Sequence, residues 1–170
     1  MALSDIAEGV TVTTRQRERG VASVDRTGES LAAQLAALDG DLPVDADVAA
    51  SLAEAYAGGA SVGSAADEVG VPPTTAAKAL HRLGFAGLSP FSPLQRDVLD
   101  DWLAGDLSRA DAVELTGASD REFALASFVA THDALDGAAE AVDGALSTSR
   151  DAMVEKRDAL AATLPDPGAD

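Results

Sequence analysis

Two threonines and three basic residues gather in the segment TTAAKALHRLG, and side chains of these types bind nucleic acid. The set comprises Thr74, Thr75, Lys78, His81 and Arg82. Lysine and arginine bind phosphate or read guanine, and threonine hydroxyls contact either bases or phosphate. A helix would place Lys78 and Arg82 one turn apart on the same face. His81 is the weaker member, because a lone histidine near a helix end often has a structural role.

This segment is predicted to form the third helix of a compact unit. Asp45 caps a first helix, Ser61 caps a second that ends at Gly70, and Pro73 suits the first turn of the third. On the third helix the inward residues are Ala76, Ala79, Leu80 and Leu83, and the outward residues are Thr74, Thr75, Ala77, Lys78, His81 and Arg82. We expect the outward face to be uncovered.

Residues 61–84, SVGSAADEVGVPPTTAAKALHRLG, resemble the DNA-binding helix-turn-helix of bacterial and archaeal regulators and of homeodomain-like domains. Small Ala65 and Ala66 stand where two helices cross, and Gly70 stands at the turn. Pro72-Pro73 departs from the family, which commonly has a Ser or Thr cap there. The resemblance implies that the third helix enters a major groove of DNA, with the five threonine and basic residues named above as contacts.

A weaker copy of the same unit follows. When the sequence is aligned with itself at an offset of 47 positions, Ser61 aligns with Ser108 and Gly70 aligns with Gly117. In this second copy the helix around FALASFV is apolar almost all round, and such helices are usually buried. We therefore expect the second copy to pack or dimerise and the first copy alone to contact DNA.

The expected fold class is all-α, with two tandem three-helix helix-turn-helix-like units and flanking N- and C-terminal helices. Aromatic residues make up only 4% of the chain, so Ala, Val and Leu must build the core, and Ala and Leu favour helices. The predicted parts are an arm and helix over 1–44, the two units over 45–88 and 89–130, C-terminal helices over 131–164, and a disordered tail over 165–170.

Two details of the flanking helices follow from hydrophobic spacing. The N-terminal helix is predicted over residues 27–38, and the C-terminal region is predicted to form two helices over 134–146 and 149–164. Met153, Leu160 and Leu164 lie on one face of the last helix. That stripe either packs against the rest of the protein or forms a homodimer, which the second unit could also mediate.

The net charge is −17, with 29 acidic residues against twelve basic ones. This composition looks like that of extreme halophiles, above all haloarchaea, and we interpret the charge as adaptation to salt. Residues 60–96 carry a net charge of +1, against −6 before them and −12 after them, so the motif is the least acidic part of the chain. The segment TTRQRERG is a second basic stretch that could contact phosphates, although a solvated segment is the simpler interpretation.

Catalysis has little support in the sequence. There are two histidines, no cysteine and no serine in a nucleophile elbow, so we expect no enzyme activity, no cofactor and no metal site. Without a signal peptide or an apolar run long enough to cross a membrane, the chain is expected to be cytoplasmic. The expected function is a DNA-binding transcriptional regulator of a halophilic archaeon. The alternatives are a non-enzymatic protein-interaction or assembly module on the same scaffold, and an RNA- or ribosome-associated role.

Overall fold

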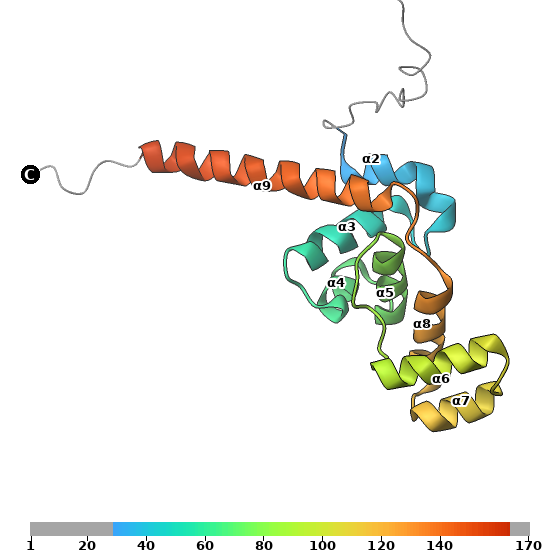
Figure 1. The fold of residues 1–170 in the computed structure, drawn as a ribbon. Coiled ribbons are helices and arrows are strands. Elements are labelled where there is room, and N and C mark those ends of the chain that lie inside the picture. The colour runs from blue at the N-terminus through green and yellow to red at the C-terminus, as the bar shows by residue number, and fades with distance from the viewer. Residues whose placement is uncertain (1–28, 164–170) are drawn as a thin grey trace, which may run out of the picture.

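The computed structural model describes residues 29–163, and within this range all regular structure is helical (Figure 1). The all-α prediction is therefore confirmed. In chain order the helices are α2 (Leu31–Leu35), the 3-10 helix η2 (Ala36–Asp41), α3 (Ala46–Ala57), α4 (Val62–Val69), α5 (Pro73–Arg82), α6 (Pro93–Ala104), α7 (Arg109–Thr116), α8 (Asp120–Thr131) and α9 (Ala138–Thr163).

Short polar side chains set where the helices begin. Six helices start after a residue whose side-chain oxygen accepts a hydrogen bond from a backbone N–H in the first turn; these residues are Ser30, Asp45, Ser61, Ser92, Ser108 and Ser119. Complete capping boxes form at Ser92 with Gln95 and at Ser119 with Glu122. At Ser108 the hydroxyl accepts from the amide of Asp111 and donates to the Asp111 carboxylate.

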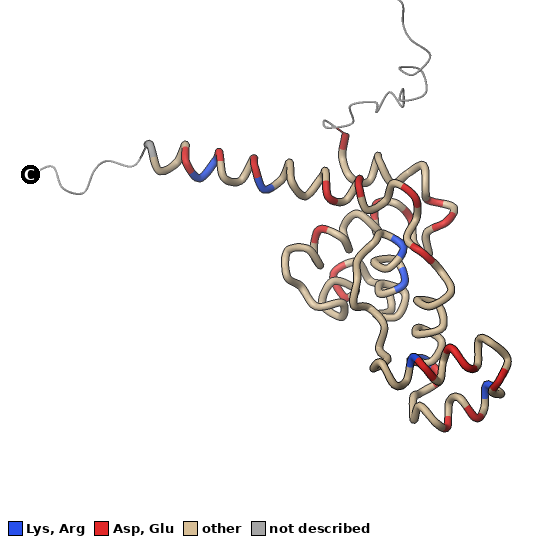
Figure 2. The backbone as a smooth tube through the Cα atoms, viewed as in Figure 1, with Lys and Arg blue, Asp and Glu red and all other residues tan. Residues whose placement is uncertain are grey.

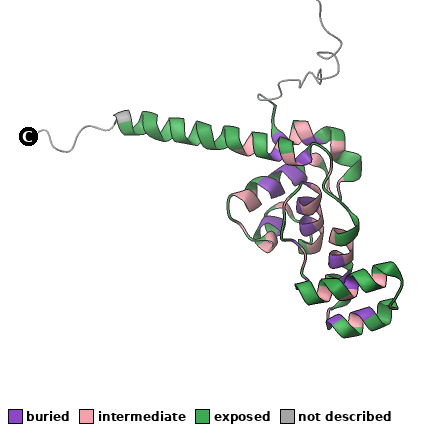
Figure 3. Ribbon diagram, in the orientation of Figure 1, coloured by how far each residue is buried: buried purple, intermediate pink, exposed green. Residues whose placement is uncertain are grey.

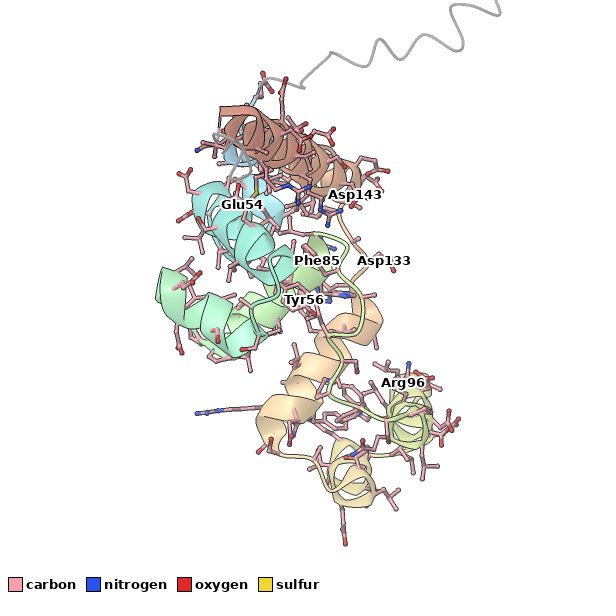
Figure 4. All side chains as sticks on the ribbon, turned by 90° about the vertical axis from the view of Figure 1, so that its left-hand side faces the viewer. Glu54, Tyr56, Phe85, Arg96, Asp133 and Asp143 are labelled. Atoms are coloured by element: carbon pink, nitrogen blue, oxygen red, sulfur yellow. The ribbon has the colours of Figure 1, made fainter. Side chains whose placement is uncertain are left out.

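Helices α3, α4 and α5 pack around one small-residue core. Its buried members are Leu52, Ala65, Ala66, Ala76, Ala79, Leu80 and Leu88. Fully buried alanines let the helices approach closely, and Gly70 ends α4 in the left-handed conformation (φ 72°) that the turn requires. Tyr56 and Phe85 close one side, edge to face at 5.2 Å between ring centroids (Figure 4).

A second cluster joins this unit to the flanking helices. It gathers Leu31 and Leu35 of α2, residues of α3, Leu83 after α5, and Ala138 and Val142 of α9. Helices α6, α7 and α8 form a third cluster around Phe91, Leu99, Ala112, Phe123 and Ala126. Each predicted three-helix unit thus has its own core cluster. The tandem-repeat interpretation itself stays a prediction.

Two boundary predictions are wrong. Helix α2 begins after Ser30 and gives way to the tighter η2 at Ala36, where one helix over 27–38 was expected. The two expected C-terminal helices are one continuous helix, α9. Its outer half extends away from the body, and α6 and α7 lie at the opposite end (Figure 1). The arm over residues 1–25, with TTRQRERG, and the tail over 165–170 lie outside the described residues.

Candidate functional site

Helix α5 carries all five predicted contact residues, and both of its ends are well defined. Pro73 occupies the first turn, as predicted. At the other end the amide of Gly84 donates to the carbonyl of His81, and the amide of Phe85 donates to that of Leu80, which is a Schellman motif. Gly84 has φ 94°, a value that favours glycine. The local sequence therefore fixes the length and the end of α5.

Helix α8 lies across the predicted contact face of α5. The ammonium of Lys78 stands 5.0 Å from the centre of the Phe128 ring. The imidazole of His81 meets the same ring edge to face, with 6.3 Å between centroids, and Phe128 also stacks on His132 at 4.0 Å. A cation close to an aromatic face is attracted by the ring quadrupole. Phe128 thus joins the two predicted units.

The C-terminal end of α5 also holds the connector between α8 and α9. Nε2–H of His81 donates to the carbonyl of His132, and the guanidinium of Arg82 donates to the carbonyl of Asp133. In the other direction, the amide of Leu135 donates to the carbonyl of Arg82 at 2.8 Å. These three hydrogen bonds determine where α9 starts. They give His81 and Arg82 a structural role in this conformation.

The expectation of an uncovered face is therefore wrong. Lys78, His81 and Arg82 are half-buried, and Ala77, expected to point outward, is 4% exposed. Thr74 and Thr75 are also half-buried, and neither side chain forms a hydrogen bond within the described part of the chain. Thr74 and Ala77 line a hollow of about 290 Å³ that Leu125 of α8 borders. The structure brings four of the five predicted residues, Thr74, Lys78, His81 and Arg82, to the junction with α8 and its connector.

The residues that sequence reasoning missed are those on the other side of this junction. The apolar run FALASFV was expected to pack, but nothing in its local pattern names α5 as the partner of Phe128. The backbone carbonyl of His132 accepts a hydrogen bond from His81, a role that depends on the backbone and not on the side-chain type. Contacts between residues 51 positions apart leave no periodic signal.

A family model described as a family of unknown function, DUF7858, matches residues 1–169. The chain belongs to the DUF7858 family. No curated protein and no solved structure matches it.

Beside α5, this DUF7858 protein has a hollow without carboxylates. It measures about 400 Å³ and is lined by Phe85, Phe91, Arg96 and His81, among other residues. The Arg96 side chain makes no hydrogen bond or ion pair within residues 29–163, and Figure 4 shows it on α6. Among the same residues, no three histidines or carboxylates come close enough to hold a metal ion. No helix described in this DUF7858 chain is both long enough and apolar enough to cross a membrane.

One carboxylate in the described region has a clearly shifted pKa. Glu122, exposed at the start of α8, accepts hydrogen bonds from the hydroxyl and the backbone amide of Ser119. These bonds favour the charged form and lower the pKa of Glu122 below its ordinary value. In this DUF7858 protein the shift reflects helix capping, so it gives no reason to assign a catalytic acid.

Proposed function

We propose that the chain is a non-enzymatic assembly module, built on a helix-turn-helix scaffold, that associates with a second copy through α9. The observation that carries this proposal is the exposure of α9 along its length. Ala138 and Val142 are buried and Leu146 is half-buried, but every residue from 147 to 161 is exposed (Figure 3). About half of the longest helix is therefore exposed in the described part of the chain, and Arg150 and Met153 border a hollow with Glu54 of α3.

The outer half of α9 also continues an apolar stripe. Leu146, Met153 and Leu160 follow one another at intervals of seven residues, so they share a face of the helix. Met153 is 71% exposed and Leu160 is 59% exposed. Helices in water gain most of their stability from burying such a stripe. A protein surface that covers Met153 would supply this packing.

The role of α5 agrees with an assembly function. Lys78, His81 and Arg82 contact α8 and its connector, so the segment that would read DNA instead joins the parts of the protein. Helix-turn-helix scaffolds serve several functions, and the site decides which one applies. In this chain the outer half of α9 is the exposed segment, so we assign the assembly function to α9.

The apolar stripe can be tested with two acidic substitutions. We expect Met153→Asp/Leu160→Asp to weaken self-association by about a hundredfold, because both side chains would have to be buried on binding. Sedimentation velocity over a range of protein concentrations, at one KCl concentration, measures the change. The matched control is Ala152→Asp/Ala159→Asp, which adds the same charges at the same spacing on another side of α9.

The control should associate like the unmodified protein, with circular dichroism confirming that α9 remains helical in both variants. A protein that sediments as a monomer at every concentration contradicts the proposal. Equal association of the stripe variant and the control contradicts it as well.

We also propose that the acidic surface is an adaptation to a salt-rich archaeal cytoplasm. Residues 29–163 contain 23 acidic and eight basic side chains, and acidic residues spread over nearly all of the fold (Figure 2). Among these residues the ion pairs are Arg109 with Asp120 at 3.0 Å and Arg157 with Asp158 at 4.0 Å. Most carboxylates therefore face solvent, where they remain hydrated in concentrated salt.

DNA binding is the second candidate function, and the partners of the two cations on α5 favour it. Lys78 contacts an aromatic ring and Arg82 contacts a backbone carbonyl, so neither is neutralised by a carboxylate. Separation of α8 from α5 would release both groups on a helix that resembles a recognition helix. In this second proposal α8 covers a latent DNA-binding face.

The DNA proposal predicts that Lys78→Ala/Arg82→Ala loses binding to genomic fragments in concentrated KCl. Removal of two phosphate or base contacts should weaken binding at least about tenfold. The control Arg96→Ala/Arg121→Ala removes two basic residues elsewhere and should bind like the unmodified protein. Because Arg82 also holds the connector, Lys78→Gln serves as a second, less disruptive variant. Absence of binding by the unmodified protein at every salt concentration contradicts this candidate.

A further inference from the structure

Two arginines in the outer half of α9 share one face of the helix with two apolar residues. Arg150, Met153, Arg157 and Leu160 follow a spacing of three, four and three residues, which places them on one face. We call these four residues the basic stripe. Asp151 and Glu155 lie away from this stripe, and Asp158 forms an ion pair with Arg157 at 4.0 Å. A chain with net charge −17 thus exposes a cationic, apolar face.

A surface of opposite character lies on α6 and α7. Leu94, Asp97 and Asp101 follow a spacing of three and four residues along α6, and Asp111 and Leu115 lie one turn apart on α7. We call these five residues the acidic face.

The two helices of the acidic face are held together where its apolar residues lie. The Gln95 side chain donates to the carbonyl of Thr116 at 2.9 Å, which brings the start of α6 to the end of α7. Leu94 and Leu115, each next to one of these bonded residues, are 75% and 64% exposed. The acidic face therefore combines uncovered leucines with carboxylates, as a receptor for the basic stripe should.

One molecule cannot bring these two surfaces together in this conformation. The outer half of α9 and the α6–α7 pair lie at opposite ends of the molecule in both views of the fold (Figures 1 and 4). Pairing of two α9 helices along their stripes would bring Arg150 and Arg157 against the same residues of the other copy, and like charges across an interface oppose binding.

We infer that the basic stripe of α9 docks on the acidic face of α6 and α7 in a second copy of the chain. This inference rests on the proposed assembly function and names the receiving surface. Leucine and methionine side chains cover one another, while Arg150 and Arg157 approach Asp97 and Asp101. Because the contact joins two different surfaces, it either closes into a ring, of which a dimer is the smallest, or continues as a chain of molecules.

A charge-swap experiment tests the pairing. The first variant, Arg150→Glu/Arg157→Glu, reverses the stripe, and the second, Asp97→Lys/Asp101→Lys, reverses the acidic face. Each alone should associate about tenfold more weakly than the unmodified protein, because attraction between exposed charges is replaced by repulsion. An equimolar mixture of the two should recover association, since each reversed surface then meets a complementary one.

The matched control is Asp151→Lys/Glu155→Lys, which changes the net charge as much as the second variant but away from the basic stripe of α9. It should associate like the unmodified protein. Sedimentation velocity in one buffer measures all samples, and circular dichroism verifies their helix content.

The outcomes separate this inference from the proposed function. Recovery in the mixture, and only there, supports the inference. If reversal of the stripe weakens association but reversal of the acidic face does not, or if the mixture stays dissociated, the inference is overturned while assembly through α9 stands. A monomeric unmodified protein overturns both.

Discussion

Gly84→Ala should destabilise the protein by about 2–4 kcal/mol, because two unfavourable effects coincide at this position. Gly84 has φ 94°, where any residue with a Cβ is strained. An added Cβ would also stand 2.9 Å from the Cβ of Ala139, in the first turn of α9. The methyl group therefore opposes both the end of α5 and the docking of α9. Denaturant unfolding followed by circular dichroism measures the loss of free energy.

Gly87→Ala is the matched control for this prediction. Gly87 lies in the same loop with φ 77°, but no atom lies within 4 Å of an added Cβ. Its substitution should cost only the backbone strain, about 1–2 kcal/mol. The difference between the two variants isolates the contact with Ala139. If both variants lose the same free energy of unfolding, α9 does not pack on this loop as described.

The sequence was a good guide to α5 itself and a poor guide to its surroundings. Ala76, Ala79, Leu80 and Leu83 are all buried, as helical spacing predicted. These positions follow from local periodicity and from caps, which act within a few residues. Whether the other face meets water depends on α8, about fifty residues later in the chain. Helical periodicity carries no information about such distant packing, so the prediction of an uncovered face failed.

The misassigned boundary in α9 has a different physical origin. The expected break between residues 146 and 149 falls on serine and threonine, which often cap helices. The same hydroxyls can bond within a helix, and Thr148 Oγ1 donates to the carbonyl of Gly144 at 2.9 Å. Local sequence permits both arrangements. The placement of Ala138 and Val142 against α2 and α3 sets the direction in which the helix continues.

Phe128→Ala should separate the two helical units more than any other single truncation at their junction. The ring contacts Lys78 and His81 of α5 and stacks on His132. Loss of a buried phenylalanine costs about 3–5 kcal/mol, and since Phe128 is only half-buried we expect about 2 kcal/mol. Denaturant unfolding measures the free energy, and amide hydrogen exchange of α5 and α8 should rise relative to that of α3.

Phe128→Leu separates the contribution of the ring from that of apolar volume. Leucine keeps most of the contact area but has no π face for Lys78, so its cost should be well below that of alanine. The same pair of variants distinguishes the two candidate functions. If α8 covers a latent DNA-binding face, Phe128→Ala should bind genomic fragments more tightly than Phe128→Leu, because Lys78 and Arg82 are released. If α5 serves assembly only, neither variant gains DNA affinity, and the junction is a structural joint whose purpose is to set the position of α9.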